Sequence, residues 1–289
     1  MGSVVDFGRY RGTFSRVMGN TTSPARVISV TSGKGGVGKT NVSVNVGLAL
    51  TQQGKRVLLL DADLGLANIN ILLGFEPKAN IQQVVKGLAS FEDIIVSHPS
   101  GLDIIPAGSG LPELTNLSEE ERTLLQSAMN SLAAEYDYVL VDTAAGIGDN
   151  VLYFNVAAED IIVVVDPEPT SITDSYAIIK VLSTRHSVNS FHILANRVPK
   201  GSDGRATYGL LSAATNKFLN VSLKFLGSIS EDESVSAAVI QQKPCLELFP
   251  SSRASLDFHK IAKKILSFEG TRKAGGGLQF FFKELVENC

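Results

Sequence analysis

The sequence predicts an α/β protein with a doubly wound, mostly parallel sheet and helices on both faces. Short β-rich runs alternate with helical stretches along most of the chain, as in consecutive βαβ units. Several of the runs are apolar on both faces, which is typical of parallel strands covered by helices. The expected strands are residues 27–31, 56–61, 102–105, 138–142, 161–166, 191–196 and 223–229.

Helical stretches fill the intervals between these strands. The first follows a glycine-rich loop, and the second opens with Ser118 and Glu121 in the spacing of a capping box. The expected helices are residues 39–53, 118–136, 171–186, 203–219, 232–241 and 252–268.

The chain divides into one large domain with short appendages. Its 289 residues are ample for a sizeable core. Residues 1–25 are polar and glycine-punctuated, with Arg9, Arg11 and Arg16, and predict an unstructured arm or a partner-binding segment. The domain itself is expected over residues 26–269. A glycine-rich linker over residues 270–277 and an amphipathic helix over residues 278–289 follow it.

Composition narrows the class of protein. Hydrophobic residues make up 44% and charged residues 19%, values that exclude a mostly disordered chain. A net charge of −3 gives no global basic field for nucleic acid. Cys245 and Cys289, the only two cysteines, exclude a disulfide scaffold or a four-cysteine zinc site and favour a reducing cytosol. We expect no secretory signal and no transmembrane helix, because no apolar run is long enough.

The strongest motif is a phosphate-binding loop between the first strand and the first helix. Residues 33–40 match G-x-x-x-x-G-K-[ST] in the structural context that the motif requires. Glycines let backbone N–H groups converge on phosphate oxygens at a helix N-terminus. Lys39 can reach the β- and γ-phosphates and Thr40 can ligate Mg²⁺. The candidate nucleotide-binding residues here are Gly33, Lys34, Gly35, Gly36, Val37, Gly38, Lys39, Thr40 and Asn41.

Carboxylates follow two of the expected strands. Asp61 and Asp63 end the strand 56–61, and Asp142 ends the apolar strand 138–142. Strand ends beside a phosphate loop are where α/β sheets place ligands. Asp142 has the position of a Walker B carboxylate, which holds Mg²⁺ directly or through water. By spacing alone, Asp61 and Asp63 are equally compatible with a metal and water site or with a turn.

The string KGGVGKT, residues 34–40, resembles the deviant Walker A motif of the MinD/ParA class of P-loop ATPases. The resemblance implies a MinD-like fold, ATP or ADP with Mg²⁺, slow switch-type hydrolysis, and an ATP-dependent homodimer. It implies that Lys34 reaches the partner's nucleotide, that Asp63 positions the attacking water with Asp61 near Mg²⁺, and that Lys39 assists catalysis.

The resemblance also implies residues that contact the adenine base. Asn196 and Arg197 follow the strand 191–196, where members of the class contact adenine. Ser230, Glu231 and Asp232 resemble the Pro-Glu-Asp loop of the class, although serine replaces proline.

Four further strings are similar to the flagellar branch, the FlhG/FleN type of number regulator. They are LLLDADLGLANINILLG, VDTAAGIGDNV, EPTSITDSYAIIK and FPSSRASLDFHKIA. This branch implies an antiactivator of a FleQ-type transcriptional activator that regulates flagellar number and placement. It also implies an FlhF-type GTPase and flagellar switch proteins as partners. The N-terminal Asp-Gln-Ala pattern that stimulates the GTPase is absent from residues 1–20, which argues against stimulation of that partner.

Three other functions compete with this interpretation. A MinD-like cell-division regulator shares the mechanism but differs in its partner. A DNA-partitioning ATPase needs a basic patch, which the acidic balance disfavours, so no direct nucleic-acid contact is expected. An iron–sulfur carrier is disfavoured because the two cysteines lie far apart.

The C-terminal segment carries a hydrophobic stripe. Leu278, Phe281, Phe282, Leu285 and Cys289 repeat with a helical period of 3.6 residues. Such a stripe can dock on the protein itself, bind a partner or bind a membrane surface. The resemblance favours a membrane-targeting helix whose membrane residues are Leu278, Phe281, Phe282 and Leu285. The predicted location is therefore the cytoplasm, with reversible peripheral association with the cytoplasmic membrane.

Overall fold

The computed structural model describes residues 25–63, 68–77, 79, 83–84, 88–106 and 135–268. Strands in this part of the chain are β1 (Arg26–Ser32), β2 (Val57–Ala62), β3 (Val96–Ser97), β4 (Asp103–Ile105), β5 (Tyr138–Ala145), β6 (Asp160–Val165), β7 (Ser190–Val198) and β8 (Ser222–Ser230). Helices are α1 (Lys39–Thr51), α2 (Ile69–Leu73), α4 (Phe91–Ile94), α6 (Asp149–Ala157), α7 (Pro169–His186), α8 (Gly204–Phe218), α9 (Glu233–Ile240), α10 (Cys245–Leu248) and α11 (Arg253–Leu266).

The described strands form one eight-stranded sheet in the order β3-β4-β2-β5-β1-β6-β7-β8. All neighbouring pairs are parallel except β3 and β4. Central β1 lies between β5 and β6, and the order reverses there, which is the arrangement of a doubly wound sheet. The predicted fold class is confirmed.

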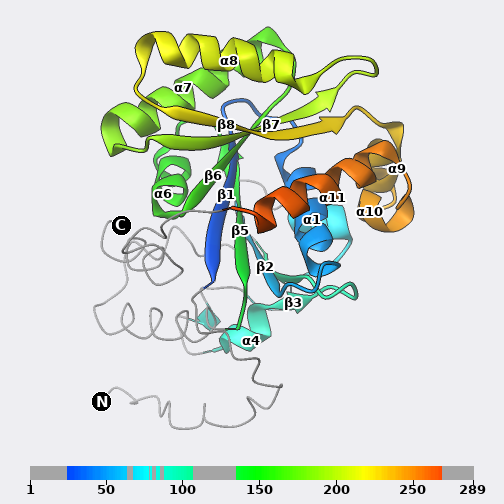
Figure 1. The fold of residues 1–289 in the computed structure, drawn as a ribbon. Helices are drawn as coiled ribbons and strands as arrows, with labels where there is room; N and C mark the ends of the chain where they lie inside the picture. The colour runs from blue at the N-terminus through cyan, green and yellow to red at the C-terminus, as the bar shows by residue number, and fades with distance from the viewer. Residues whose placement is uncertain are drawn as a thin grey trace, which may run out of the picture.

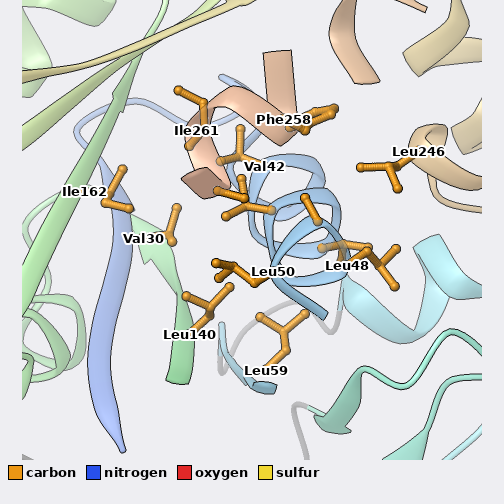
Figure 2. Packing of buried hydrophobic residues seen from close by; sticks show 14 of the residues in the cluster. Val30, Val42, Leu48, Leu50, Leu59, Leu140, Ile162, Leu246, Phe258 and Ile261 are labelled. Carbon is orange, nitrogen blue, oxygen red and sulfur yellow. The ribbon is translucent and has the colours of Figure 1, made fainter. Parts of the chain in front are cut away.

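Helices cover both faces of this sheet, as Figure 1 shows: α6, α7 and α8 lie on one side, and α1 and α11 lie on the other. Helix α1 is buried between the sheet and α11. Figure 2 shows Val42, Leu48 and Leu50 of α1 among Val30, Leu59 and Leu140 of the sheet and Phe258 and Ile261 of α11. The helix that begins at the phosphate loop is therefore fixed by the core on both sides.

All seven predicted strands are present, with ends that differ by up to three residues from the prediction. Of the predicted helices, five correspond to α1, α7, α8, α9 and α11. Most of the sixth, residues 118–136, lies outside the described residues. Its predicted end is wrong, because Glu135 and Tyr136 are described and are not helical. The sequence prediction missed β3, α2, α4, α6 and α10.

Side chains cap several of the predicted helices. Asp203 accepts a hydrogen bond from the backbone N–H of Arg205 at the start of α8, and Ser252 accepts one from Ser255 at the start of α11. Within the described ranges, no helix is both long and apolar enough to cross a membrane. The predicted arm (residues 1–24 of it), the linker and the amphipathic tail lie outside the described residues.

Candidate functional site

The phosphate loop connects β1 to α1 at the carboxyl end of the sheet. Gly36 and Gly38 adopt positive φ angles of 79° and 92°, which glycine accommodates without strain. A Cβ atom on Gly35 or Gly36 would meet nothing within 4 Å, and both glycines are exposed. Gly38 is the N-cap of α1 and offers no side-chain oxygen to the first turn. The loop and helix end therefore present backbone donors in the manner of an anion site.

Two distant segments brace this loop from outside. A Cβ on Gly33 would lie 2.0 Å from the backbone carbon of Asp174, so only glycine allows α7 to pack against the start of the loop. At the other end, Asn196 Nδ2 donates to the carbonyl oxygen of Val37 at 2.7 Å, and Asn196 is buried. The same nitrogen would lie 2.6 Å from a Cβ on Gly38. Asn196, predicted as a base contact, thus also holds the shape of the loop.

Two buried carboxylates lie side by side below the loop. Asp61 on β2 is paired in register with Asp142 on β5, and both are buried. Ser43 Oγ donates to Asp142 Oδ1 at 2.8 Å, and the Thr40 hydroxyl also hydrogen-bonds Asp142. Burial raises the pKa of Asp61 to about 7, with the charge of Asp142 as the second cause, and burial raises the pKa of Asp142 to about 6.

This donor set fits Mg²⁺. Carboxylate and hydroxyl oxygens are its preferred protein ligands, and it is commonly held by one or two carboxylates plus substrate phosphates. A cation would also offset the repulsion between the adjacent carboxylates. Burial lowers the pKa of the nearby Lys39 ammonium, while the charges of Asp142 and Asp63 oppose that shift. The searched residues contain no cluster of three or more His, Cys, Asp or Glu ligands.

Asp61 and Asp63 differ in their surroundings. Asp61 accepts backbone N–H bonds from Asp63, Asn68 and Ile69, each at 3.2 Å, and so anchors the start of α2. Asp63 is less buried, and its Oδ2 accepts a hydrogen bond from Asn68 Nδ2 at 3.3 Å. The geometry therefore gives Asp61 a structural role in addition to its predicted place near Mg²⁺. The sequence analysis missed Asn68, although it lies within a quoted string.

Lys34 points to α7. Its ammonium hydrogen-bonds Glu168, the N-cap residue of α7, and donates to Thr170 Oγ1 at 3.1 Å. The Glu168 carboxylate raises the pKa of Lys34, and Lys34 in turn lowers the pKa of Glu168. About one third of the Lys34 side chain is exposed (33%), so a second molecule can reach it. Glu168 is not among the predicted site residues, because no local signal connects it with Lys34, 134 residues away along the chain.

The other predicted base-contact residues lie at or directly after the carboxyl ends of β7 and β8. Arg197 is the penultimate residue of β7, with an exposed side chain and an unusual positive φ of 52°. Ser230 Oγ donates to Asp257 Oδ2 at 2.7 Å. Asp232 caps α9 by accepting from Ser234 N at 2.9 Å, and it also accepts from Ala254 N at 3.2 Å. These bonds tie the predicted base loop to α11.

The remaining predicted residues are placed simply. Asn41 lies in the first turn of α1, where its carbonyl accepts from Asn45 Nδ2 at 2.8 Å. Glu231 is exposed beside Asp232. The predicted membrane residues Leu278, Phe281, Phe282 and Leu285 lie outside the described residues. Together, the loop, the oxygen ligands and a half-buried carboxylate can bind a nucleotide polyphosphate with a divalent cation and orient a water molecule.

Comparison with known proteins agrees with a nucleotide-binding site. A sequence model of the AAA domain family matches residues 25–191. The chain is 45% identical to the antiactivator FleN of Pseudomonas aeruginosa, over 92% of this chain and 95% of that protein. It is 34% identical to the flagellum site-determining protein YlxH of Helicobacter pylori, over 93% and 91% of the two chains.

A solved structure of the septum site-determining protein MinD from Pyrococcus horikoshii, complexed with Mg-ADP, has a similar fold. The TM-score is 0.65 at 26% identity, with 83% of this chain and 96% of that chain covered.

Proposed function

Given that this chain belongs to the AAA-domain family and to the MinD/ParA class of P-loop ATPases, in the branch of FleN and YlxH, we propose that it is an ATP-driven switch that regulates flagellar number and placement. The observation that carries this proposal is the 45% identity to FleN over 92% of the chain, which extends far beyond the phosphate loop. FleN is named an antiactivator, so the proposed partner is a flagellar transcriptional activator of the FleQ type. FlhF-type GTPases and flagellar switch proteins are further proposed partners.

Each residue of the site has a separate proposed role in ATP hydrolysis. Bound Mg²⁺-ATP supplies the transferable phosphoryl group. The loop amides and Lys39 hold the phosphates, and Thr40, Asp142 and Asp61 hold the metal or its waters. Asp63 orients the attacking water, and Asn196 and Arg197 contact the base. We propose slow turnover, because the reaction serves to reset a switch.

Lys34 is the residue proposed to stabilise the ATP-bound dimer. The MinD/ParA resemblance assigns it to the nucleotide of a second protomer. Its partly exposed ammonium on Glu168 and Thr170 supports that assignment, since it is reachable from outside. ATP would then assemble a homodimer with two nucleotides at the interface, and hydrolysis would undo it. The proposed division is an arm over residues 1–25, an ATPase domain over 26–269, a linker over 270–277 and a membrane-binding helix over 278–289.

The experiment that tests this function is deletion in the source organism, followed by counts of flagella and of division septa per cell. Loss of an antiactivator should raise the number of flagella and leave septum placement normal. A chain carrying Lys39→Ala should fail to restore the normal count, whereas wild type should restore it. Misplaced septa with normal flagella would instead support the MinD-like alternative. Tight binding to non-specific DNA at low salt would support a partitioning ATPase.

A further inference from the structure

A cavity lies at the outer edge of the sheet, lined by residues in or next to β3, β4, α2, α9 and α10. Its volume is about 480 Å³, which is within the range of ligand-binding pockets in proteins. Strands β4, β2 and β5 separate β3 from β1, the strand that leads into the phosphate loop. The cavity shares no lining residue with that loop. Its apolar lining consists of Leu73, Phe75, Val96, Pro99 and Ile104.

The cavity also contains two side chains of opposite charge, and one of them already has its partners. Glu247 of α10 accepts a hydrogen bond from the hydroxyl of Ser100, and its Oε1 lies 3.4 Å from His98 Nδ1. Lys243 is exposed, and it forms no ion pair with any residue that the structure describes. The charge that a ligand can still match is therefore the Lys243 ammonium.

Exposed apolar side chains lie beside this cavity. Gln242, which lines it, donates from Nε2 to the carbonyl oxygen of Ile71 at 3.0 Å and follows Ile240 by two residues. Ile71 is 62% exposed and Ile240 is 83% exposed. Apolar side chains that gather next to a concave surface are typical of interaction sites. We call the cavity together with Ile71 and Ile240 the edge groove.

Two helices that border the edge groove begin at the proposed nucleotide site. Helix α2 starts where Asp61 accepts the backbone N–H of Ile69 at 3.2 Å, and it ends at the cavity only five residues later. Helix α9 starts at its N-cap residue Asp232, in the predicted base loop, and ends just before Gln242. The hydrogen bond from Gln242 to Ile71 joins the far ends of the two helices. A shift of Asp61 or of the base loop would therefore reach the groove through one short helix.

We propose that the edge groove binds a short segment of another protein, with an apolar side chain in the cavity and a neighbouring carboxylate on Lys243. Leucine, isoleucine or phenylalanine suits the apolar lining, and aspartate or glutamate suits the unmatched charge. A protein segment fits better than a small molecule, because a molecule that only fills the cavity leaves Ile71 and Ile240 in water. The groove should therefore recognise an acidic and apolar sequence.

Binding at the edge groove should also depend on the bound nucleotide, and this part rests on the proposed ATP site. A ligand shifts an equilibrium only when it binds two states with different affinity. Because α2 and α9 start at the metal carboxylate and the base loop, the groove is placed to differ between the ATP and ADP states. The nucleotide and the protein segment would then change each other's affinity by the same factor.

The first test is selection from a phage-displayed library of random peptides on the full chain with a non-hydrolysable ATP analogue. The same library is applied to a double variant with Ile240→Ser and Lys243→Glu, both at exposed positions. We expect the peptides that only wild type retains to carry leucine, isoleucine or phenylalanine beside aspartate or glutamate. A retained set that is basic, or the absence of any peptide that distinguishes the two chains, would overturn the proposal.

Fluorescence anisotropy with the best retained peptide then measures the charged contact. Lys243→Glu should weaken binding roughly tenfold, because an attraction becomes a repulsion. This loss should shrink in 1 M salt, where the Debye length is about 3 Å. Lys180→Glu makes the same change at an exposed position on α7 and should have no effect. A peptide whose acidic residue is replaced by lysine should prefer the Lys243→Glu chain, and a preference for wild type would contradict the assigned ion pair.

The apolar contact is measured in the same assay. Ile240→Ser should weaken binding roughly tenfold in low and in high salt, because less apolar surface is removed from water. Leu210→Ser, at an exposed position on α8, is the matched control and should bind the peptide as wild type does. Equal losses in the two variants would overturn the assignment of the peptide to the edge groove.

Two measurements distinguish other occupants of the groove. A chain that ends at Gly277 should bind the peptide as the full chain does, and binding by the shortened chain alone would assign the groove to the protein's own C-terminal segment. The double variant should still form the ATP-dependent dimer in sedimentation velocity. Loss of that dimer would assign the groove to a second copy of the chain. Either contrary result would overturn the assignment to another protein.

The dependence on nucleotide has its own test. Peptide affinity with the ATP analogue and with ADP should differ by about fivefold or more. Calorimetric titration of both nucleotides, without peptide, is the control. Equal peptide affinity in a chain that binds both nucleotides would overturn the link between the groove and the nucleotide site. Failure to bind either nucleotide would instead contradict the proposed function.

Discussion

Lys34 is the residue that distinguishes this phosphate loop from an ordinary one. It bonds Glu168 and Thr170 on α7 and remains one-third exposed. We expect Lys34→Ala to abolish the ATP-dependent dimer, because the cross-protomer contact is lost. ADP binding by the monomer should persist through Lys39 and the loop amides. Sedimentation velocity with ATP measures the dimer and calorimetric titration measures ADP binding, with Lys200→Ala as a control on an exposed turn. A dimer of wild-type strength in the variant would contradict the role given to Lys34.

Substitution of Asp63 tests the proposed chemistry of the site. It is less buried than Asp61 and is held by Asn68 Nδ2 at 3.3 Å. We expect Asp63→Ala to bind ATP and dimerise but to hydrolyse about a hundredfold more slowly, a barrier increase of about 2.7 kcal/mol. Asn68→Ala should cause a smaller loss, because it removes only the bond that positions the carboxylate. Single-turnover hydrolysis measures the effect, and near-normal turnover of Asp63→Ala would reassign that residue to the turn.

Asn196 has one observed contact and one predicted role, which can be tested separately. Its Nδ2 holds the carbonyl oxygen of Val37, and its predicted role is a base contact. Asn196→Ala leaves that carbonyl unpaired, which should cost about 1–3 kcal/mol of binding free energy for ATP. Inorganic tripolyphosphate, which lacks a base, should lose affinity to the same extent. Arg197→Ala should weaken ATP alone. Calorimetric titration decides the point, since unimpaired tripolyphosphate binding by Asn196→Ala would leave only the base contact.

At the scale of elements, Arg26, Asp160 and His192 fasten Phe268, which follows α11, to the sheet. Asp160 is largely buried; burial opposes ionisation, but the hydrogen bonds from His192 and Arg26 outweigh it and lower the pKa of the Asp160 carboxyl. A carboxyl whose pKa is lower in the folded state adds stability above its unfolded pKa. That contribution is lost as the pH falls through the lower folded value.

Asp160→Asn should therefore reduce the free energy of unfolding by about 1–3 kcal/mol at pH 7. The difference from wild type should stay constant down to pH 3.8, the ordinary pKa of the group, and should shrink below it. Urea unfolding at a series of pH values measures this difference. Glu233→Gln, at an exposed position on α9, serves as the control. A difference that grew on acidification would contradict the assigned ion pair.

The sequence was sufficient to predict the helices and strands that carry a local signal. Strands such as β5 and β6 are buried on both faces and read as continuous apolar runs, and helices such as α8 and α11 begin at side-chain caps. Strand β3 has two residues and no such run. Helix α6 is buried on residues that include Asn155, which bonds Ser29, so its polar and apolar residues follow no clear period.

The same distinction holds for the site. The phosphate loop is contiguous in sequence, and its glycines and Lys39 are recognisable there. The contacts that distant residues make with the loop are not recognisable, although Asn196 itself is predicted as a base contact. Glu168 and Asn196 lie 134 and 159 residues from Lys34 and Val37, the residues they contact. Only the sheet order, which places β6 next to β1 and β7 next to β6, brings them together.

At the scale of the whole molecule, the two functional ends of the sheet are separate. The proposed nucleotide site lies at the carboxyl ends of the strands, whereas Arg26 and Phe268 meet at the amino end of β1. The proposed dimerisation would connect the nucleotide state to the proposed membrane contact, because it would double the number of C-terminal segments on one particle.

The final prediction concerns this coupling. One apolar stripe of Leu278, Phe281, Phe282 and Leu285 is too small for firm attachment, but two stripes on a dimer can bind together. We expect vesicle binding to be roughly a hundredfold stronger with a non-hydrolysable ATP analogue than with ADP. Phe282→Glu should abolish binding in both states, because it places a charge in the centre of the apolar face, while dimerisation persists. Lys34→Ala should bind vesicles with the ATP analogue only as weakly as wild type does with ADP. Vesicle flotation measures all three, and equal binding of wild type in the two nucleotide states would show that lipid attachment is independent of the ATP switch.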